Sequence, residues 1–147
     1  MQISELDKSA MRFVLAVFVS LNCSICFAAD IKGVWNTRDG DATLKLRPCG
    51  DDLCAQIIAL KVPFNKETGK PLTDNNNPDT AKHVNPVIGL ELFVTMKPAG
   101  ENLWQGKIYD PDGGKYYDAK VRFDGENVTV KGCILGGMIC RNEVWVR

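Results

Sequence analysis

Hydrophobic residues recur at every second position in a series of short segments that begins near residue 30. A period of two is that of a β-strand with one face buried and the other in water. We count about eight such segments and no convincing amphipathic helix. The positions expected to face inward are Ala42, Leu44, Leu46, Leu90, Leu92, Val94, Met96, Trp104, Gly106, Ile108, Ala119, Val121, Phe123, Val128, Val130, Val144 and Val146.

Turn-forming residues separate these segments, at Asp39-Gly40, in residues 110–114 and at Asp124-Gly125. Turns this short join neighbouring antiparallel strands. Closure of such a sheet removes the exposed edges that would otherwise invite aggregation. The sequence therefore predicts an all-β fold, namely a single small antiparallel up-and-down β-barrel.

One segment, residues 62–86, lacks the alternation. It is polar, rich in Asn, Pro and Lys, and contains His83, the only histidine of the chain. It is also longer than most connections in compact domains. Two interpretations stay open, a lid over one end of the barrel and a mobile loop.

The residues before the predicted barrel have the features of a secretory signal peptide. The apolar run 13–21 is about half of the roughly 20 residues that a membrane-spanning helix needs. Arg12 precedes this run, and Cys26 and Ala28 provide small residues at the cleavage positions. We predict a signal peptide over residues 1–28, with Met11 as an alternative start, and a mature domain over residues 29–147. The expected location is periplasmic or secreted, with no transmembrane segment in the mature chain.

The charge balance bears on the class of partner. Lys and Arg total 18, as do Asp and Glu, so the formal net charge is zero. A nucleic-acid partner would require an excess of cations to displace counterions from phosphates. We therefore expect no nucleic-acid partner.

Export gives the four cysteines after the predicted leader a structural meaning, because disulfides persist in an oxidising compartment. Three pairings are possible. A turn centred on Asp51-Asp52 would place one pair opposite each other, and Gly136-Gly137 lies midway between the other pair. An ideal two-residue turn would suit the second bridge less well, which predicts a bulge or a longer loop there. A redox pair or a zinc site is disfavoured by the spacings. We expect two hairpins closed by disulfides, Cys49 with Cys54 and Cys133 with Cys140.

Several motifs are spread over nearly the whole predicted mature chain. They include Gly33-Val34-Trp35, Pro48-Cys49, Leu53-Cys54, Asp74…Asn77-Pro78, the run from Trp104 to Pro111, the run from Gly132 to Gly137, Cys140-Arg141 and Trp145-Val146-Arg147. Together they resemble an exported bacterial family known as domain of unknown function 2147 (DUF2147). Ala55 and Ile88 depart from the family pattern, which usually has glycine and often cysteine there. The resemblance implies a periplasmic or secreted protein with a lipocalin-like β-barrel, and it supplies no activity.

Two tryptophans are expected to meet where the barrel closes. Trp35 lies on the first predicted strand and Trp145 on the last, together with Arg141 and Arg147. An arginine stacked on an indole contributes about 0.5 to 2 kcal/mol. We predict that these residues plug one end of the barrel, with either arginine stacked on Trp35, and that they do not bind a ligand.

The densest cluster of polar and aromatic side chains spans residues 109–117. The simpler interpretation is a hairpin turn in which Tyr109 and Tyr117 form a cross-strand pair. The alternative places the polar groups at the mouth of the barrel, facing a ligand. The ligand-binding residues suggested by this alternative are Trp104, Tyr109, Asp110, Lys115 and Tyr117.

Metal and catalytic motifs are weak. Asp74, Asn76 and Asp79 offer oxygen ligands, but the glycine and the closing glutamate of a calcium loop are missing. No Gly-x-Ser-x-Gly elbow accompanies His83. Acidic residues are plentiful, yet nothing selects a carboxylate pair of the kind that hydrolyses glycosides. We expect no metal and no cofactor, and a hydrolase is the third hypothesis.

The preferred hypothesis is an exported lipocalin-like binding module that holds a small apolar or amphipathic ligand. The second is an envelope protein with a solid core, whose outer face meets another protein or the cell wall. The two hypotheses differ in one quantity, because a binding module needs a connected interior cavity of roughly 300 Å³ or more. The predicted mature chain is short, and its large apolar side chains would fill the interior under the second hypothesis.

Overall fold

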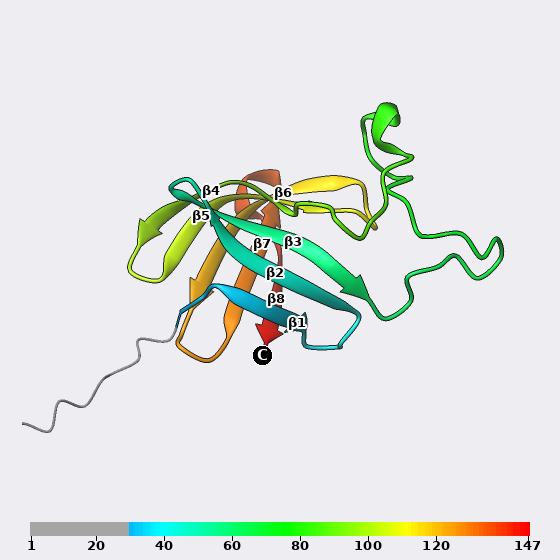
Figure 1. The fold of residues 1–147 in the computed structure, drawn as a ribbon. Helices are drawn as coiled ribbons and strands as arrows, with labels where there is room; N and C mark the ends of the chain where they lie inside the picture. The colour runs from blue at the N-terminus through cyan, green and yellow to red at the C-terminus, as the bar shows by residue number, and fades with distance from the viewer. Residues whose placement is uncertain (1–29) are drawn as a thin grey trace, which may run out of the picture.

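The computed structural model describes residues 30–147, and the predicted leader lies outside the described residues. Eight antiparallel strands follow one another around a closed barrel (Figure 1). The all-β, up-and-down barrel predicted from the sequence is thereby confirmed. No helix within residues 30–147 is long and apolar enough to cross a membrane. The elements are β1 (Gly33–Thr37), β2 (Ala42–Cys49), β3 (Asp52–Leu60), η1 (Thr80–Lys82), β4 (Phe93–Gly100), β5 (Leu103–Asp110), β6 (Lys115–Phe123), β7 (Val128–Ile134), η2 (Leu135–Gly137) and β8 (Ile139–Val146).

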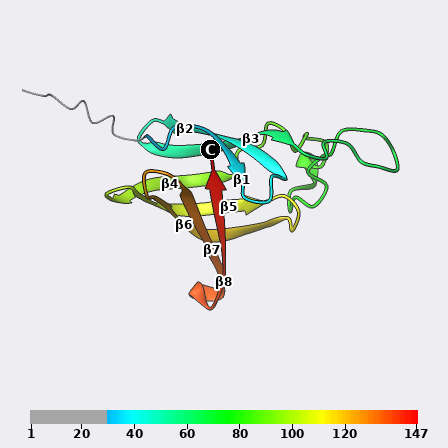
Figure 2. The same ribbon diagram turned by 90° about the horizontal axis from the view of Figure 1, so that it is seen from below.

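The barrel closes where β1 pairs with β8, with Asn36 opposite Val146 and Thr37 opposite Trp145. Figure 2 shows the C-terminal end of β8 beside β1. Trp35 is completely buried and meets the ring of Phe123 edge to face, with 5.8 Å between the ring centroids. This aromatic pair lies in the part of the interior that side chains fill completely.

Arg147 covers Trp35. Its guanidinium carbon lies 4.6 Å from the centre of the indole ring. The same guanidinium donates hydrogen bonds to the carbonyl oxygens of Asp30 and Lys32, and the indole Nε1 donates to the carbonyl oxygen of Ile31 over 2.7 Å. The first and last described residues are thus joined over one end of the barrel. Arg141, the other arginine that we considered for this role, lies elsewhere.

The strand order assigns each turn to one end of the barrel. The β2–β3, β4–β5 and β6–β7 turns lie at the same end as Arg147, and the β1–β2, β3–β4, β5–β6 and β7–β8 connections lie at the other. Large buried side chains fill the half of the barrel near Arg147. They are Trp35, Leu46, Met96, Val121, Phe123 and Val128.

Two strands depart from the predicted alternation. On β4, Phe93 and Met96 are buried and Val94 is exposed, because the register with β5 shifts between Val94 and Lys97. Such a bulge inserts a residue and reverses which side chains face inward. On β8, Trp145 lies opposite the buried Val128, so Trp145 faces inward and its neighbours Val144 and Val146 do not.

Both disulfide bonds form, Cys49–Cys54 and Cys133–Cys140. The first turn differs from its prediction. Cys49 lies opposite Asp52, so the turn consists of residues 50 and 51, and Cys54 is diagonal to Cys49 with 5.9 Å between the Cα atoms. The turn is thus shifted by one residue from its predicted position, and Gly50 allows this because its φ is +66°. In the second hairpin the cysteines lie opposite each other, and η2 provides the longer loop.

Two lysines lie directly opposite each other on the outer face, Lys120 on β6 and Lys131 on β7. Like charges in this position destabilise a sheet. We predict that Lys131→Glu raises the free energy of unfolding by about 0.2 to 1 kcal/mol, measured by urea denaturation. Lys131→Gln should give a smaller gain, and high salt should reduce the difference between the two variants. Equal stability of the two variants at low salt would contradict this prediction.

The long connection between β3 and β4 is fastened to the β5–β6 hairpin. Asp74 is 1% exposed, and its Oδ1 accepts a hydrogen bond of 2.6 Å from the hydroxyl of Tyr109. Its Oδ2 accepts one of 2.6 Å from Nδ2 of Asn77. At Gly114 a Cβ atom would lie 1.8 Å from the carbonyl oxygen of Asn76, so only glycine permits this approach. The outer part of the connection projects away from the barrel (Figure 1), whereas its base is anchored beside the open end.

The aromatic pair of this hairpin is Tyr109 with Tyr116, whose ring centroids are 4.8 Å apart. The sequence prediction paired Tyr109 with Tyr117 and was wrong by one residue. The β5–β6 register places Tyr117 opposite Ile108, on the other face of the sheet. Tyr109 therefore packs under the long connection, and Tyr117 faces the interior.

Candidate functional site: a cavity at the open end of the barrel

The barrel is hollow at the end opposite Arg147. A cavity of about 610 Å³ lies there, bounded by the β1–β2 and β5–β6 turns, by β8 and by the base of the long connection. This volume exceeds the roughly 300 Å³ that a small-molecule site needs. Trp35, Met96, Val121 and Phe123 are not in its wall, because they fill the other half of the interior.

The inner wall of the cavity is apolar. Inward-facing side chains from five strands and from the residue before β4 form it, and they are Leu44, Ile57, Leu92, Ile108, Val130 and Trp145. The β3–β4 connection extends this wall with Val62, Leu72 and Val87. The connection thus contributes three apolar residues to the cavity.

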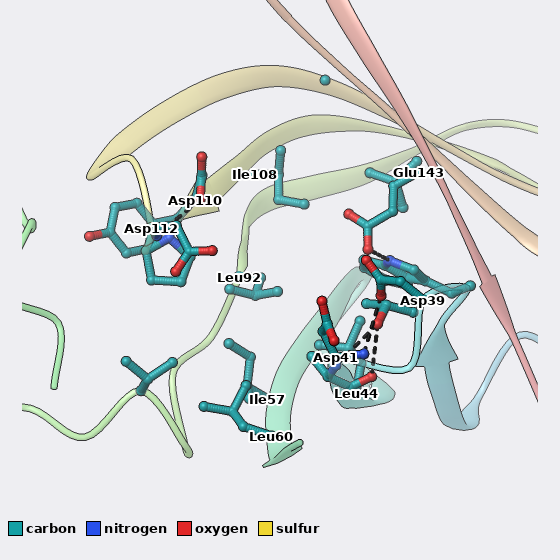
Figure 3. Close-up of a pocket in the computed structure, with 18 of the residues that line it drawn as sticks. Asp39, Asp41, Leu44, Ile57, Leu60, Leu92, Ile108, Asp110, Asp112 and Glu143 are labelled. Carbon is teal, nitrogen blue, oxygen red and sulfur yellow. Dashed lines mark hydrogen bonds between the residues drawn. The ribbon is translucent and has the colours of Figure 1, made fainter. Parts of the chain in front are cut away.

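Five carboxylates line the same cavity. Asp39 and Asp41 come from the β1–β2 turn, Asp110 and Asp112 from the β5–β6 hairpin, and Glu143 from β8. Figure 3 shows Asp39, Asp41 and Glu143 on one side and Asp110 and Asp112 on the other, with apolar side chains between the two groups. Among the described residues, Arg141 is the only lysine or arginine in the lining.

Strand β8 places two charged side chains at the open end of the barrel. Its register places Trp145 opposite Val128, Glu143 opposite Val130 and Arg141 opposite Gly132. Because side chains alternate between faces, Arg141, Glu143 and Trp145 all lie on the inward row. Arg141 and Glu143 are both exposed, so this row places their charges at the open mouth of the barrel, where a ligand can reach them.

Comparison with known proteins places the chain in a family. Residues 33–147 match the family described as "Uncharacterized protein conserved in bacteria (DUF2147)". The chain belongs to this family. The resemblance found in the sequence motifs is thus confirmed. Among curated proteins, none matches the sequence.

One solved structure has the same fold as this DUF2147 protein. It is HP1028 from the human pathogen Helicobacter pylori, described as a protein that belongs to the lipocalin family. The sequences are 16% identical, the TM-score is 0.67, and the match covers 81% of this chain and 83% of that one. At this identity the match establishes the lipocalin-like fold alone.

The surroundings of Glu143 in the DUF2147 site shift the pKa of its carboxyl group upward. Burial against the barrel wall raises the pKa of its carboxyl group, and the negative charges of Asp39 and Asp110 raise it further. A 2.9 Å hydrogen bond from the indole Nε1 of Trp145 and the charge of Arg141 oppose this shift. The net effect is that the cavity disfavours the negative charge of Glu143, because Trp145 and Arg141 only partly compensate it.

The pKa of the Asp39 carboxyl group is shifted in the opposite direction. Hydrogen bonds from the side chain of Thr37 and from the backbone N–H of Asp41 lower the pKa of its carboxyl group. Asp39 thus stays charged on the same side of the cavity as Glu143. Within residues 30–147, no three His, Cys, Asp or Glu side chains are grouped so as to hold a metal ion.

The structure divides the residues that the sequence suggested for ligand binding. Tyr109, Asp110 and Tyr117 line the cavity of this DUF2147 protein. Trp104 does not, because its register with Pro98 and Val121 places it in the filled half, where it packs against the core. Lys115 is exposed at the start of β6 and also lies outside the lining.

Other cavity residues were missed from the sequence, or were given another role. They are Asp39, Asp41, Asp112, Glu143 and Arg141, the last of which we had considered for the plug. A usable indication was present on the last strand. If Trp145 faces inward, as a plug requires, then the period of two also turns Glu143 and Arg141 inward.

Proposed function

We propose that this DUF2147 domain is an exported binding module that holds a small amphipathic ligand in the open end of its barrel. The observation that supports this most directly is the cavity of about 610 Å³, with an apolar inner wall and a polar rim. Small-molecule sites commonly combine a mostly apolar lining with a few polar groups that orient the ligand. The apolar part of the ligand would lie against Leu44, Ile57 and Ile108.

The cavity favours this function over a solid-core envelope protein. A barrel with a purely structural role has no need to leave half of its interior empty, and unfilled space costs stability. Here one half is packed and the other half is open and lined by charged groups. The two disulfides are consistent with export, because disulfides persist in oxidising compartments.

A carboxylate-pair hydrolase is supported less well. Asp39 and Glu143 have pKa values shifted in opposite directions, as an acid and its partner often have. A glycosidase pair, however, flanks the scissile bond from two sides. Figure 3 shows Asp39 and Glu143 on the same side of the cavity. Their arrangement suits recognition of a ligand better than cleavage of a bond.

A neutral fluorescent probe tests the proposed function. N-phenyl-1-naphthylamine should bind saturably at one site, with increased emission. Ile108→Trp fills the cavity and should weaken probe binding by about tenfold or more, or 1.4 kcal/mol. Ile58 lies outside the cavity lining and is exposed, so Ile58→Trp is the matched control and should bind as the wild type does.

Circular dichroism and thermal unfolding would show that both variants fold. If Ile108→Trp is too unstable, Leu60→Trp fills the same cavity from β3. Unchanged probe affinity in a folded cavity-filling variant would overturn the proposed function. So would a wild-type protein that does not bind the probe at all.

A further inference from the structure

We infer that the ligand of this cavity is an organic cation, with an apolar body and a positively charged end. The inference rests on the proposed function and adds the charge of the ligand to it. Its basis is the juxtaposition of an apolar inner wall with a rim that has five carboxylates and one guanidinium. A cleft with low-dielectric walls and charges of one sign concentrates ligands of the opposite sign.

The protein itself neutralises only a small part of the charge at the rim. Among the described residues, Asp41 is the only one of the five with an ion-pair partner, Lys61, whose Nζ lies 3.5 Å from its Oδ1. Both of these side chains are well exposed, so the pair screens the cavity only weakly. Asp110 accepts a hydrogen bond of 3.0 Å from the backbone N–H of Asp112, which orients the carboxylate, and it has no ion-pair partner among the described residues.

Glu143 marks the depth at which the positive end would lie. It stands between the rim carboxylate Asp39 and the inner-wall residue Trp145, which follows it on the inward row of β8. A cation here would meet a carboxylate that is already held in place by the 2.9 Å hydrogen bond from the indole Nε1 of Trp145, so less side-chain freedom is lost when the charge pair forms. The apolar body would then extend toward Leu44 and Ile57.

The same geometry argues against a bound metal ion as the occupant. A metal ion needs several ligands converging at about 2 to 2.6 Å. Here the carboxylates stand on two sides of the cavity with Leu92 and Ile57 between them (Figure 3). Charges separated in this way suit a ligand large enough to span the opening.

Three alkyl ligands of equal length test the charge. Decylamine, decanol and decanoate are each used to displace N-phenyl-1-naphthylamine at neutral pH and low salt. Decylamine should displace the probe at a concentration about tenfold lower than decanol, and decanoate should be the weakest. High salt should reduce the advantage of the amine, because rim charges are screened.

Glu143→Gln is the decisive variant, because it keeps the shape of the side chain and removes its charge. It should lower the affinity for decylamine at least about fivefold and leave that for decanol unchanged. Glu126→Gln, at an exposed turn at the other end of the barrel, is the matched control and should change neither affinity. Decanol binding shows whether a variant still folds, because decanol has no charge. A variant that binds decanol normally but decylamine weakly has lost only the recognition of charge.

Repeating the decylamine displacement assay at decreasing pH provides a second test of the role of Glu143. Asp39, Asp110 and Arg141 are the charged groups that act on Glu143. As the pH falls through the raised pKa of Glu143, the wild type should lose affinity for decylamine before Glu143→Gln does. The affinity for decanol should stay constant in both proteins.

The possible failures are distinguishable. If decanol or decanoate binds as tightly as decylamine while the probe still binds, the cavity is a ligand site and the inference about charge is wrong. If decanoate binds best, Arg141 rather than the carboxylates selects the ligand, and the inference is again wrong. If neither the probe nor any alkyl ligand binds, the proposed function fails and the inference fails with it.

Discussion

Trp35→Ala will lower the free energy of unfolding by about 3 to 5 kcal/mol. The indole is completely buried, and its removal leaves a void beside Phe123. The same change removes the ring beneath the guanidinium of Arg147 and the donor to the carbonyl oxygen of Ile31. Urea denaturation measures the loss, and the melting temperature should fall by on the order of 10 °C or more.

Two further measurements make this result specific. Arg147→Ala removes only the stacked cation and its backbone hydrogen bonds, so it should cost about 0.5 to 2 kcal/mol. Trp35→Ala should leave the affinity for N-phenyl-1-naphthylamine nearly unchanged below its melting temperature, because Trp35 does not line the cavity. A variant of wild-type stability that no longer binds the probe would show that Trp35 belongs to the ligand site.

Asp74→Ala will cost about 2 to 4 kcal/mol, because it leaves the hydroxyl of Tyr109 and the amide of Asn77 without their acceptor in a buried site. Tyr109→Phe should cost about 1 to 3 kcal/mol. The double variant should be more stable than the sum of the two losses implies, by roughly 0.5 kcal/mol or more, since the two residues share one bond. Lys66→Ala, at an exposed position of the same connection, is the control and should leave stability nearly unchanged.

The hydrogen bond between Tyr109 and Asp74 also predicts that the protein loses stability at alkaline pH. Burial raises the pKa of Tyr109 well above its ordinary value, and the hydrogen bond to Asp74 raises it further. The unfolded chain releases this proton near pH 10 while the folded chain retains it. Stability therefore falls as the pH rises above about 10, through the range up to the folded pKa. Tyr109→Phe should show a shallower decline, and identical slopes in the two proteins would contradict the assignment.

Strand number, direction and most inward positions could be predicted from the sequence. Leu44, Leu46, Val121 and Phe123 are buried as expected, because alternation is a local property of an extended chain. The failures have local causes that a pattern of hydrophobic residues does not show. A bulge turns Val94 outward, and an inward Trp145 reverses the assignment of Val144 and Val146.

The candidate site was less predictable. Asp110 and Tyr117 were found because aromatic and polar residues are dense around their turn. Asp39 and Glu143 were not found, since neither stands in a recognisable motif. They become part of the site only because the fold brings them beside the same cavity. Tyr109 was found, but its partner Asp74 lies 35 positions away in the chain.

The linear order of residues was enough to indicate a barrel, its two disulfide-closed hairpins and its family, because each depends on spacing within one or two neighbouring strands. The empty half of the interior and its ring of carboxylates depend on closure, which brings residues 39, 110 and 143 around one opening. How much of an interior stays unfilled follows from packing across the whole barrel, and no short segment of the chain contains that information.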